Sequence, residues 1–211
     1  MSSQNKILLA VTAVAAITIG WYAIRVIPPS LPQKQDLQTE PRDIVRANPF
    51  DQVRGDRNAT KTLIEFGDLE CPVCGELDPQ ISALIKQQPD IRLVWKDCPS
   101  SLHPNAETAA EAALCAGDQG KYWEYHDLLI QNQDRLGPAL YPQLAAVLKL
   151  NAALFAACLG NGDKAAQVQA GLNECAAGGV TDLPGFFING KAMTGPKADI
   201  VREISLELNR N

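Results

Sequence analysis

Two cysteines separated by two residues are the strongest chemical feature of the sequence. Cys71-Pro72-Val73-Cys74 follows a short apolar run and precedes a segment with helical periodicity. At the N-terminus of a helix, unpaired backbone N–H groups and the positive end of the helix dipole stabilise a thiolate. Pro72 suits the first helical turn, where no N–H donor is needed. The arrangement predicts a redox-active pair in which Cys71 is the nucleophile and Cys74 resolves the mixed disulfide.

Zinc binding is the alternative use of two cysteines at this spacing. Tetrahedral zinc needs four ligands, and the sequence has neither a second C-x-x-C nor two histidines at ligand spacing. Its two histidines, His103 and His126, lie far apart in the chain. We therefore favour redox chemistry and expect no metal and no cofactor.

The segments around the cysteines predict how they are positioned. Residues 62–66 form a short, β-prone apolar run and predict a buried strand, after which apolar residues recur at helical spacing up to residue 88. Residues 91–95 predict a second strand. Because a helix connects these two strands, we expect them to run parallel in one sheet.

The second half of the chain contains a helical region and then a return to strands. Residues 104–178 are rich in alanine and have several helical periods separated by glycine-containing breaks. Asn189-Gly190 lies between two short apolar runs and predicts a tight antiparallel hairpin, and a final helix is expected to begin at Pro196. The fold class is therefore α/β, a sandwich with an all-helical excursion.

Glu65 lies in the middle of the first predicted strand, among apolar residues. Strand alternation can place such a residue on a solvated face. The functional alternative is a buried carboxyl group under the cysteines, where it accepts a proton from Cys74 when the disulfide forms. A charge in that place is costly unless it has a partner or a use.

The N-terminus predicts export. An uninterrupted run of apolar and small residues at 7–24 lies between Lys6 and Arg25 and is close to the length of about 20 residues that spans a bilayer. We interpret residues 1–25 as a signal anchor, with a cleaved signal peptide as the alternative. Residues 26–48 contain four prolines and form a linker. The folded domain is then residues 49–211, on the periplasmic side of a bacterial cytoplasmic membrane.

Several motifs together resemble the DsbA-like branch of the thioredoxin superfamily. They are, in chain order, Gly55, Ala59, Glu65-Phe66-Gly67-Asp68, Cys71-Pro72, Cys74, His103-Pro104-Asn105-Ala106, Gly120 to Asp127, and Leu183 to Gly190. The resemblance implies a thioredoxin fold with an all-helical insert, here preceded by an N-terminal transmembrane helix.

The same resemblance assigns roles to individual residues. It implies that Pro184 follows a cis peptide bond and faces the disulfide, that the backbone of Leu183 pairs with the substrate chain, and that Glu65 is the family's buried acid. His103 and His126 fall in helical-insert positions, where capping and packing are the preferred interpretation.

The dipeptide between the cysteines departs from strongly oxidising family members, which have histidine where this chain has Val73. Valine offers neither a charge nor a donor, and the nearby acids Asp68 and Glu70 add negative charge. We therefore expect a less stabilised Cys71 thiolate, and a redox potential on the reducing side of the histidine-containing relatives.

We expect the four further cysteines to form two structural disulfides in an oxidising compartment, Cys115–Cys158 and Cys98–Cys175, and six reduced cysteines are the alternative. Some members of the resembled family have a disulfide between positions similar to Cys115 and Cys158. Cys98 and Cys175 mark the two hinges between core and insert, where the crossing chains should be neighbours. Cys158–Cys175 is a shorter-range competitor of this pairing.

Taken together, these features predict thiol–disulfide exchange with unfolded or partly folded exported proteins, and a disulfide-forming oxidase in particular. A disulfide reductase or isomerase, or a thioredoxin-fold chaperone or metal-delivery module without turnover, remain alternatives. The resemblance implies a quinone-linked membrane redox partner. The net charge of −5 and the lack of a basic cluster argue against nucleic acid as a partner.

Overall fold

The computed structural model describes residues 45–195 and 197–210. The predicted anchor at 1–25 and all but the end of the predicted linker at 26–48 lie outside these residues. Among the helices in the described part, none combines the length and apolar character needed to cross a membrane.

A five-stranded mixed sheet with the order β1-β3-β2-β4-β5 forms the centre of the fold. β2 and β3 run parallel, and the other neighbouring pairs are antiparallel. The strands are β1 (Gln52–Arg54), β2 (Lys61–Gly67), β3 (Ile91–Asp97), β4 (Gly185–Ile188) and β5 (Lys191–Ala192). The parallel pair joined by a helix is as predicted, whereas the short edge strand β1 was not anticipated from the sequence.

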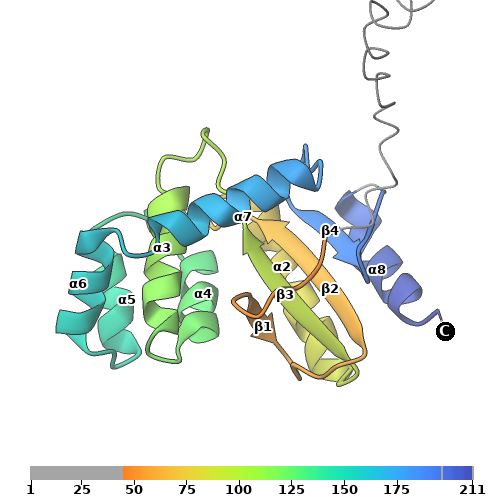
Figure 1. Ribbon diagram of the computed structural model, residues 1–211, viewed down its shortest axis with the longest axis horizontal. Coiled ribbons are helices and arrows are strands. Elements are labelled where there is room, and N and C mark those ends of the chain that lie inside the picture. The colour runs from red at the N-terminus through yellow and green to blue at the C-terminus, as the bar shows by residue number, and fades with distance from the viewer. Residues whose placement is uncertain (1–44, 196, 211) are drawn as a thin grey trace, which may run out of the picture. The chain divides into compact units, whose positions relative to one another are not determined.

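Helices cover both faces of the sheet (Figure 1). On one face, α2 (Pro72–Gln87) and α8 (Ile200–Leu208) pack their apolar side chains against those of β2 and β3. On the other face, α7 (Ala165–Ala177) covers Ile64, Phe66 and Phe187. Because helices cover both faces, every residue of β2 from Leu63 to Gly67 is buried, and burial does not alternate along the strand.

The helical region forms its own apolar core beside the sheet. It is built from α3 (Ala106–Gly117), α4 (Tyr122–Ile130), the 3-10 helix η1 (Gln133–Arg135), α5 (Tyr141–Val147) and α6 (Ala152–Asn161), and α7 leads back to the sheet. Alanines fill the centre of α3, which lets the neighbouring helices approach closely. This is the predicted thioredoxin fold with a helical insert.

The hairpin between β4 and β5 turns at Asn189 and Gly190, which have φ values of 49° and 90°. Positive φ at both positions is typical of the tight hairpin turn that Asn-Gly predicts. Asn189 also fastens the hairpin to β2, since its Oδ1 accepts from the backbone N–H of Thr62 at 3.0 Å. A second 3-10 helix, η2 (Lys197–Asp199), then leads into α8.

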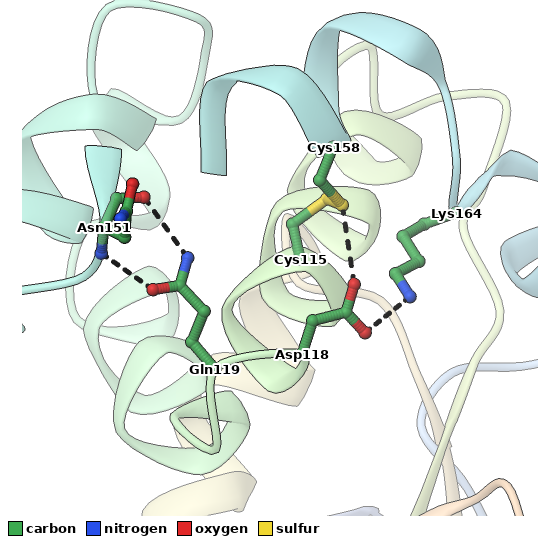
Figure 2. Close-up of a disulfide and its surroundings, with 6 residues drawn as sticks. All are labelled: Cys115, Asp118, Gln119, Asn151, Cys158 and Lys164. Carbon is green, nitrogen blue, oxygen red and sulfur yellow. Dashed lines mark hydrogen bonds and ion pairs between the residues drawn. A yellow bond between two sulfur atoms is a disulfide. The ribbon is translucent and has the colours of Figure 1, made fainter. Parts of the chain in front are cut away.

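Two disulfides connect distant parts of the domain. Cys98, just after β3, is bonded to Cys175 in α7, and Cys115 in α3 is bonded to Cys158 in α6. Polar bonds flank the second disulfide (Figure 2). The Nζ of Lys164 lies 2.7 Å from Asp118 Oδ1, and the backbone N–H of Asn151 donates to Gln119 Oε1 at 2.7 Å. The insert is therefore tied together by covalent and polar bonds as well as by its core.

Candidate active site

Cys71 and Cys74 lie where the end of β2 passes into α2, and both have free thiols. Cys71 is the residue that caps the helix and Pro72 is the first helical residue. The Cys71 backbone N–H donates to the carbonyl of Asp68 at 3.1 Å, which closes the turn after the strand. Cys71 is 7% exposed and Cys74 is fully buried, so only Cys71 is open to a partner sulfur.

The two thiols differ strongly in acidity. A hydrogen bond from the Cys74 thiol lowers the pKa of Cys71 to about 6, and the backbone N–H groups of Cys74 and Val73 add to this effect against the opposing influence of burial. The same thiol hydrogen bond, together with burial, raises the pKa of Cys74 above its usual range. At neutral pH, Cys71 is therefore a thiolate and Cys74 is a thiol that donates to it.

Glu65 is fully buried on the face of β2 that α2 covers, which excludes the solvated-face interpretation. Neither of its carboxyl oxygens has a hydrogen-bond partner among the described residues. Burial raises its pKa well above the usual value, the nearby Asp78 raises it further, and Arg54 and Lys197 oppose this rise. The Glu65 carboxyl group is therefore suited to holding a proton beneath the cysteines.

The peptide bond between Leu183 and Pro184 is cis. β4 pairs with β2 so that Gly185 lies opposite Phe66, which places Pro184 beside the end of β2, where the turn to Cys71 begins. Pro184 is buried and Leu183 partly buried. The backbone ahead of β4 thus borders the redox turn, as the substrate-pairing role predicted for Leu183 requires.

Asp68 and Glu70 are not the free negative charges that the sequence suggested. Asp68 is buried and accepts hydrogen bonds from the backbone N–H of Glu70, from that of Ser100 and from Nδ1 of His103, at 2.7, 2.8 and 2.7 Å. Glu70 accepts from the backbone and side chain of Asn105, at 2.6 and 2.8 Å. Both acids fasten the loop after β3 to the redox turn. Asp68 raises the pKa of Cys71, but the hydrogen bonds from Cys74 and Val73 outweigh this effect.

The two histidines have different surroundings. The hydrogen bond with Asp68 raises the pKa of His103, so this residue takes part in fastening the loop. His126 is buried and packs its ring against Trp95, with 4.5 Å between ring centroids. His126 also converges with Asp78 and Asp127, with one ligand atom of each within 4.8 Å of the others. Because Arg54 already pairs with Asp127, we assign no metal there.

Sequence reasoning missed Lys197, which follows Pro196 at the start of η2. Its Nζ donates to the carbonyl oxygen of Pro184, and its charge interacts with Cys71, Cys74 and Glu65. Burial lowers the pKa of Lys197, and the nearby cysteines and acids oppose this shift. No local pattern marks this lysine, since its partners are more than a hundred residues earlier or lie in the segment just before β4.

Comparison with known proteins assigns the family. The family described as Thioredoxin matches residues 47–202, and the chain belongs to it. Two solved structures are similar in fold. The thiol-disulfide exchange protein alpha-DsbA2 from Wolbachia pipientis is 21% identical, with a TM-score of 0.65, and the match covers 75% of this chain and 87% of that one. BdbD from Bacillus subtilis is 22% identical, with a TM-score of 0.65, and the match covers 74% and 91%. The fold is thus that of the DsbA-type proteins.

The curated relatives are named as antiporters, unlike the two solved structures, and they are much longer than this chain. The Na⁺/H⁺ antiporter NhaA 1 of Salinispora arenicola is 35% identical over 200 residues, which are 91% of this chain and 31% of the relative. The chain thus spans about a third of the length of this relative. The similarity relates this chain to one part of that protein.

Proposed function

We propose that this protein catalyses thiol–disulfide exchange through Cys71 and Cys74. The observation that carries the proposal is the unequal pair at the start of α2, with Cys71 acidic and slightly exposed while Cys74 is protonated and fully buried. A stabilised thiolate at the exposed position is both a good nucleophile at neutral pH and a good leaving group. Inert structural cysteines have neither property.

The reaction in the oxidising direction begins with the Cys71–Cys74 disulfide. A substrate thiolate attacks the Cys71 sulfur, the S–S bond of the enzyme breaks, and Cys74 leaves as a thiolate that takes a proton from the Glu65 carboxyl group. A second substrate thiolate then attacks the substrate sulfur of the mixed disulfide, and Cys71 leaves as its stabilised thiolate. The substrate gains a disulfide and loses two electrons, which the enzyme dithiol now holds.

We favour a disulfide-forming oxidase over a reductase or isomerase. Stabilising the Cys71 thiolate stabilises the reduced enzyme, which makes the disulfide more oxidising. A Cys71 pKa of about 6 lies between thioredoxin at about 7 and DsbA at about 3.5, so we expect a potential between their values of about −270 and −120 mV. A potential in this range would lie on the reducing side of the strongly oxidising, histidine-containing relatives.

The setting of the reaction follows from the cysteines outside the redox pair. Two disulfides that join distant elements persist only under oxidising conditions, which supports an extracytoplasmic domain. We propose residues 1–25 as its membrane anchor and 26–48 as its linker. Exported, partly folded proteins are then the substrates, and a quinone-linked membrane protein reoxidises the dithiol. Membrane fractionation with protease protection tests this proposal. A domain that is degraded only after the cytoplasmic membrane is broken would contradict it.

The similarity to antiporters adds no transport function to this proposal. The shared segment makes up about a third of the antiporter from Salinispora arenicola, and we infer that it is the thioredoxin-family part of that protein. Ion transport would require the remaining part.

The decisive experiment compares three proteins in insulin reduction and in oxidation of a reduced, unfolded ribonuclease. We expect the unaltered oxidised protein to introduce disulfides, Cys71→Ser to be inactive in both assays, and the Cys71 thiolate of Cys74→Ser to attack the disulfides of insulin and remain trapped as a mixed disulfide. Activity that survives Cys71→Ser would refute the assignment. A folded protein that prevents aggregation without turnover would indicate the chaperone alternative.

A further inference from the structure

Gln133, at the start of η1, reaches from the helical insert to the redox turn. Its Nε2 donates to the carbonyl oxygen of Leu69 and to that of Cys71, each at 2.9 Å. The two hydrogens of this amide nitrogen therefore bind the carbonyl oxygens on either side of Glu70, the residue before the nucleophile Cys71. The two partners lie 64 and 62 residues earlier in the chain, so this contact is entirely tertiary.

Gly75, directly after Cys74, leaves the space that this amide occupies. A Cβ atom at position 75 would lie only 2.0 Å from the Oε1 of Gln133, a separation that real Cβ contacts do not reach. Glycine is otherwise an unfavourable residue inside a helix. Its presence in the first turn of α2 is explained if the Gln133 amide must lie against the helix backbone at this point.

The bridged carbonyls belong to the segment that orients Cys71. The Cys71 carbonyl accepts both the Gln133 amide and the backbone N–H of Gly75, the latter at 3.0 Å. With φ at −75° and ψ at 121°, Cys71 keeps the extended conformation of a helix cap. In that conformation the backbone N–H groups of Val73 and Cys74 reach the Cys71 sulfur.

The insert holds Gln133 firmly in place. The backbone N–H of Asn132 donates to Leu129 at 3.0 Å, the N–H of Arg135 donates to Asn132 at 2.9 Å, and Leu129 and Leu136 are buried in the core of the insert. The amide is therefore fixed by a part of the chain that contains neither redox cysteine.

We propose that Gln133 is a positioning residue that holds Cys71 at the start of α2, so that the helical insert sets the reactivity of the redox cysteine. This inference rests on the proposed function of the pair and assigns a second segment of the chain to it. Gly75 is the matching residue, whose missing side chain makes the contact possible.

The first test measures Cys71 directly. The reduced Gln133→Ala variant should be alkylated at Cys71 roughly fivefold more slowly at mildly acidic pH, because the N–H groups that stabilise the thiolate lose their alignment. Its redox potential should move in the reducing direction. The exposed neighbour Gln131→Ala is the control and should match the unaltered protein. An unchanged Cys71 titration and potential in Gln133→Ala would overturn the proposal.

The second test is a double-mutant cycle between Gln133 and Gly75. Gly75→Ala should lower the unfolding midpoint in the unaltered background, because the new methyl group meets the amide. In the Gln133→Ala background, the same change should leave the midpoint unchanged or raise it, since alanine favours the helix. An equal loss of stability in both backgrounds would show that the amide is not what Gly75 accommodates, and would also overturn the proposal.

These measurements are separable from the proposed function. Alkylation, redox potential and unfolding can each be measured on a protein that turns over no substrate. A shifted Cys71 titration in Gln133→Ala supports the positioning role even if the insulin and ribonuclease assays fail. If Gln133→Ala has full activity and an unshifted titration of Cys71, only the positioning role of Gln133 is refuted.

Discussion

The redox pair with the carboxyl group beneath it differs from the surroundings of the insert disulfide in how the polar groups are partnered. Around the redox turn, Glu65 is buried without a hydrogen-bond partner in the described part of the chain, and Cys71 is held in its charged form. In the insert, Asp118 pairs with Lys164, Gln119 bonds Asn151 twice, and a disulfide joins Cys115 to Cys158 (Figure 2). The core thus keeps groups poised for proton and electron transfer, whereas the insert is built for rigidity, which a positioning role requires.

The largest expected effect comes from removing the disulfide of the insert. Its cysteines are 43 residues apart, and closing a loop of this size stabilises a protein by about 4 kcal/mol in the chain-entropy account. We expect Cys115→Ala with Cys158→Ala to lose about this much unfolding free energy in urea while retaining exchange activity. In the reduced protein, the double variant Cys71→Ala with Cys74→Ala should lose only about 1 kcal/mol of unfolding free energy. Equal losses for the two pairs would end the contrast between the regions.

Replacing Glu65 should lower the activity of the protein and raise its stability. Because its folded pKa is raised, the unaltered protein loses stability as pH rises from the unfolded value near 4.5 through the folded value, by about 1.4 kcal/mol for each unit of the shift. Glu65→Gln should remove this decline and be more stable than the unaltered protein above that range. The step in which the proton moves between Glu65 and Cys74 should slow by about 100-fold.

The control for Glu65 is the exposed Glu76→Gln on α2, which should leave both the pH profile and the exchange rate unaltered. Unfolding free energies measured at several pH values decide the matter. A Glu65→Gln protein whose stability still declines with pH would mean that another group, such as Asp78, causes the decline.

The dipeptide offers a smaller and more selective change. Val73 is 38% exposed beside Cys71 and contributes no charge. Val73→His should lower the pKa of Cys71 and move the potential toward that of strong oxidants, with 30 mV corresponding to about 1.4 kcal/mol. Val73→Leu is the uncharged control. If the histidine variant and the leucine variant have the same potential in a glutathione titration, the backbone alone controls the redox poise.

The smallest expected effect is that of Lys197. Its removal in Lys197→Met deletes a partly buried positive charge that interacts with both cysteines and with Glu65. We expect alkylation of Cys71 at acidic pH to slow by about twofold to threefold, in keeping with a screened charge at the protein surface. Lys191→Met, in the exposed strand β5, should have no effect. Equal behaviour of the two variants would remove Lys197 from the site.

The parts of this molecule that could be predicted from sequence are those with a local cause. Cys71-Pro72 begins a helix because proline needs no N–H donor there, and Asn189-Gly190 turns a hairpin because both residues tolerate positive φ. Hydrophobic periodicity and turn residues predicted the order of the elements, and the family resemblance supplied the cis bond before Pro184. The structure joins the other four cysteines as Cys115–Cys158 and Cys98–Cys175.

The parts that could not be predicted depend on contacts between distant segments. Alternation along β2 cannot show which face is buried when helices cover both, so the environment of Glu65 needed the structure. The acids at 68 and 70 read as repulsive charges until the loop that binds them is located. Gln133 lies in a short 3-10 helix with no pattern of its own, and only its bonds to Leu69 and Cys71 give it a role.

The bond between Cys98 and Cys175 has a consequence for cleavage and for engineering. The chain leaves the sheet at Cys98 and returns toward it at Cys175, 77 residues later. The disulfide therefore closes the helical segment into a covalent ring that is attached to the core. A protease cut anywhere inside that ring would leave both fragments attached until the protein is reduced. For the same reason, the segment can be replaced by the corresponding segment of a relative while the disulfide keeps both of its ends attached to the core. It is therefore a suitable unit for chimeras.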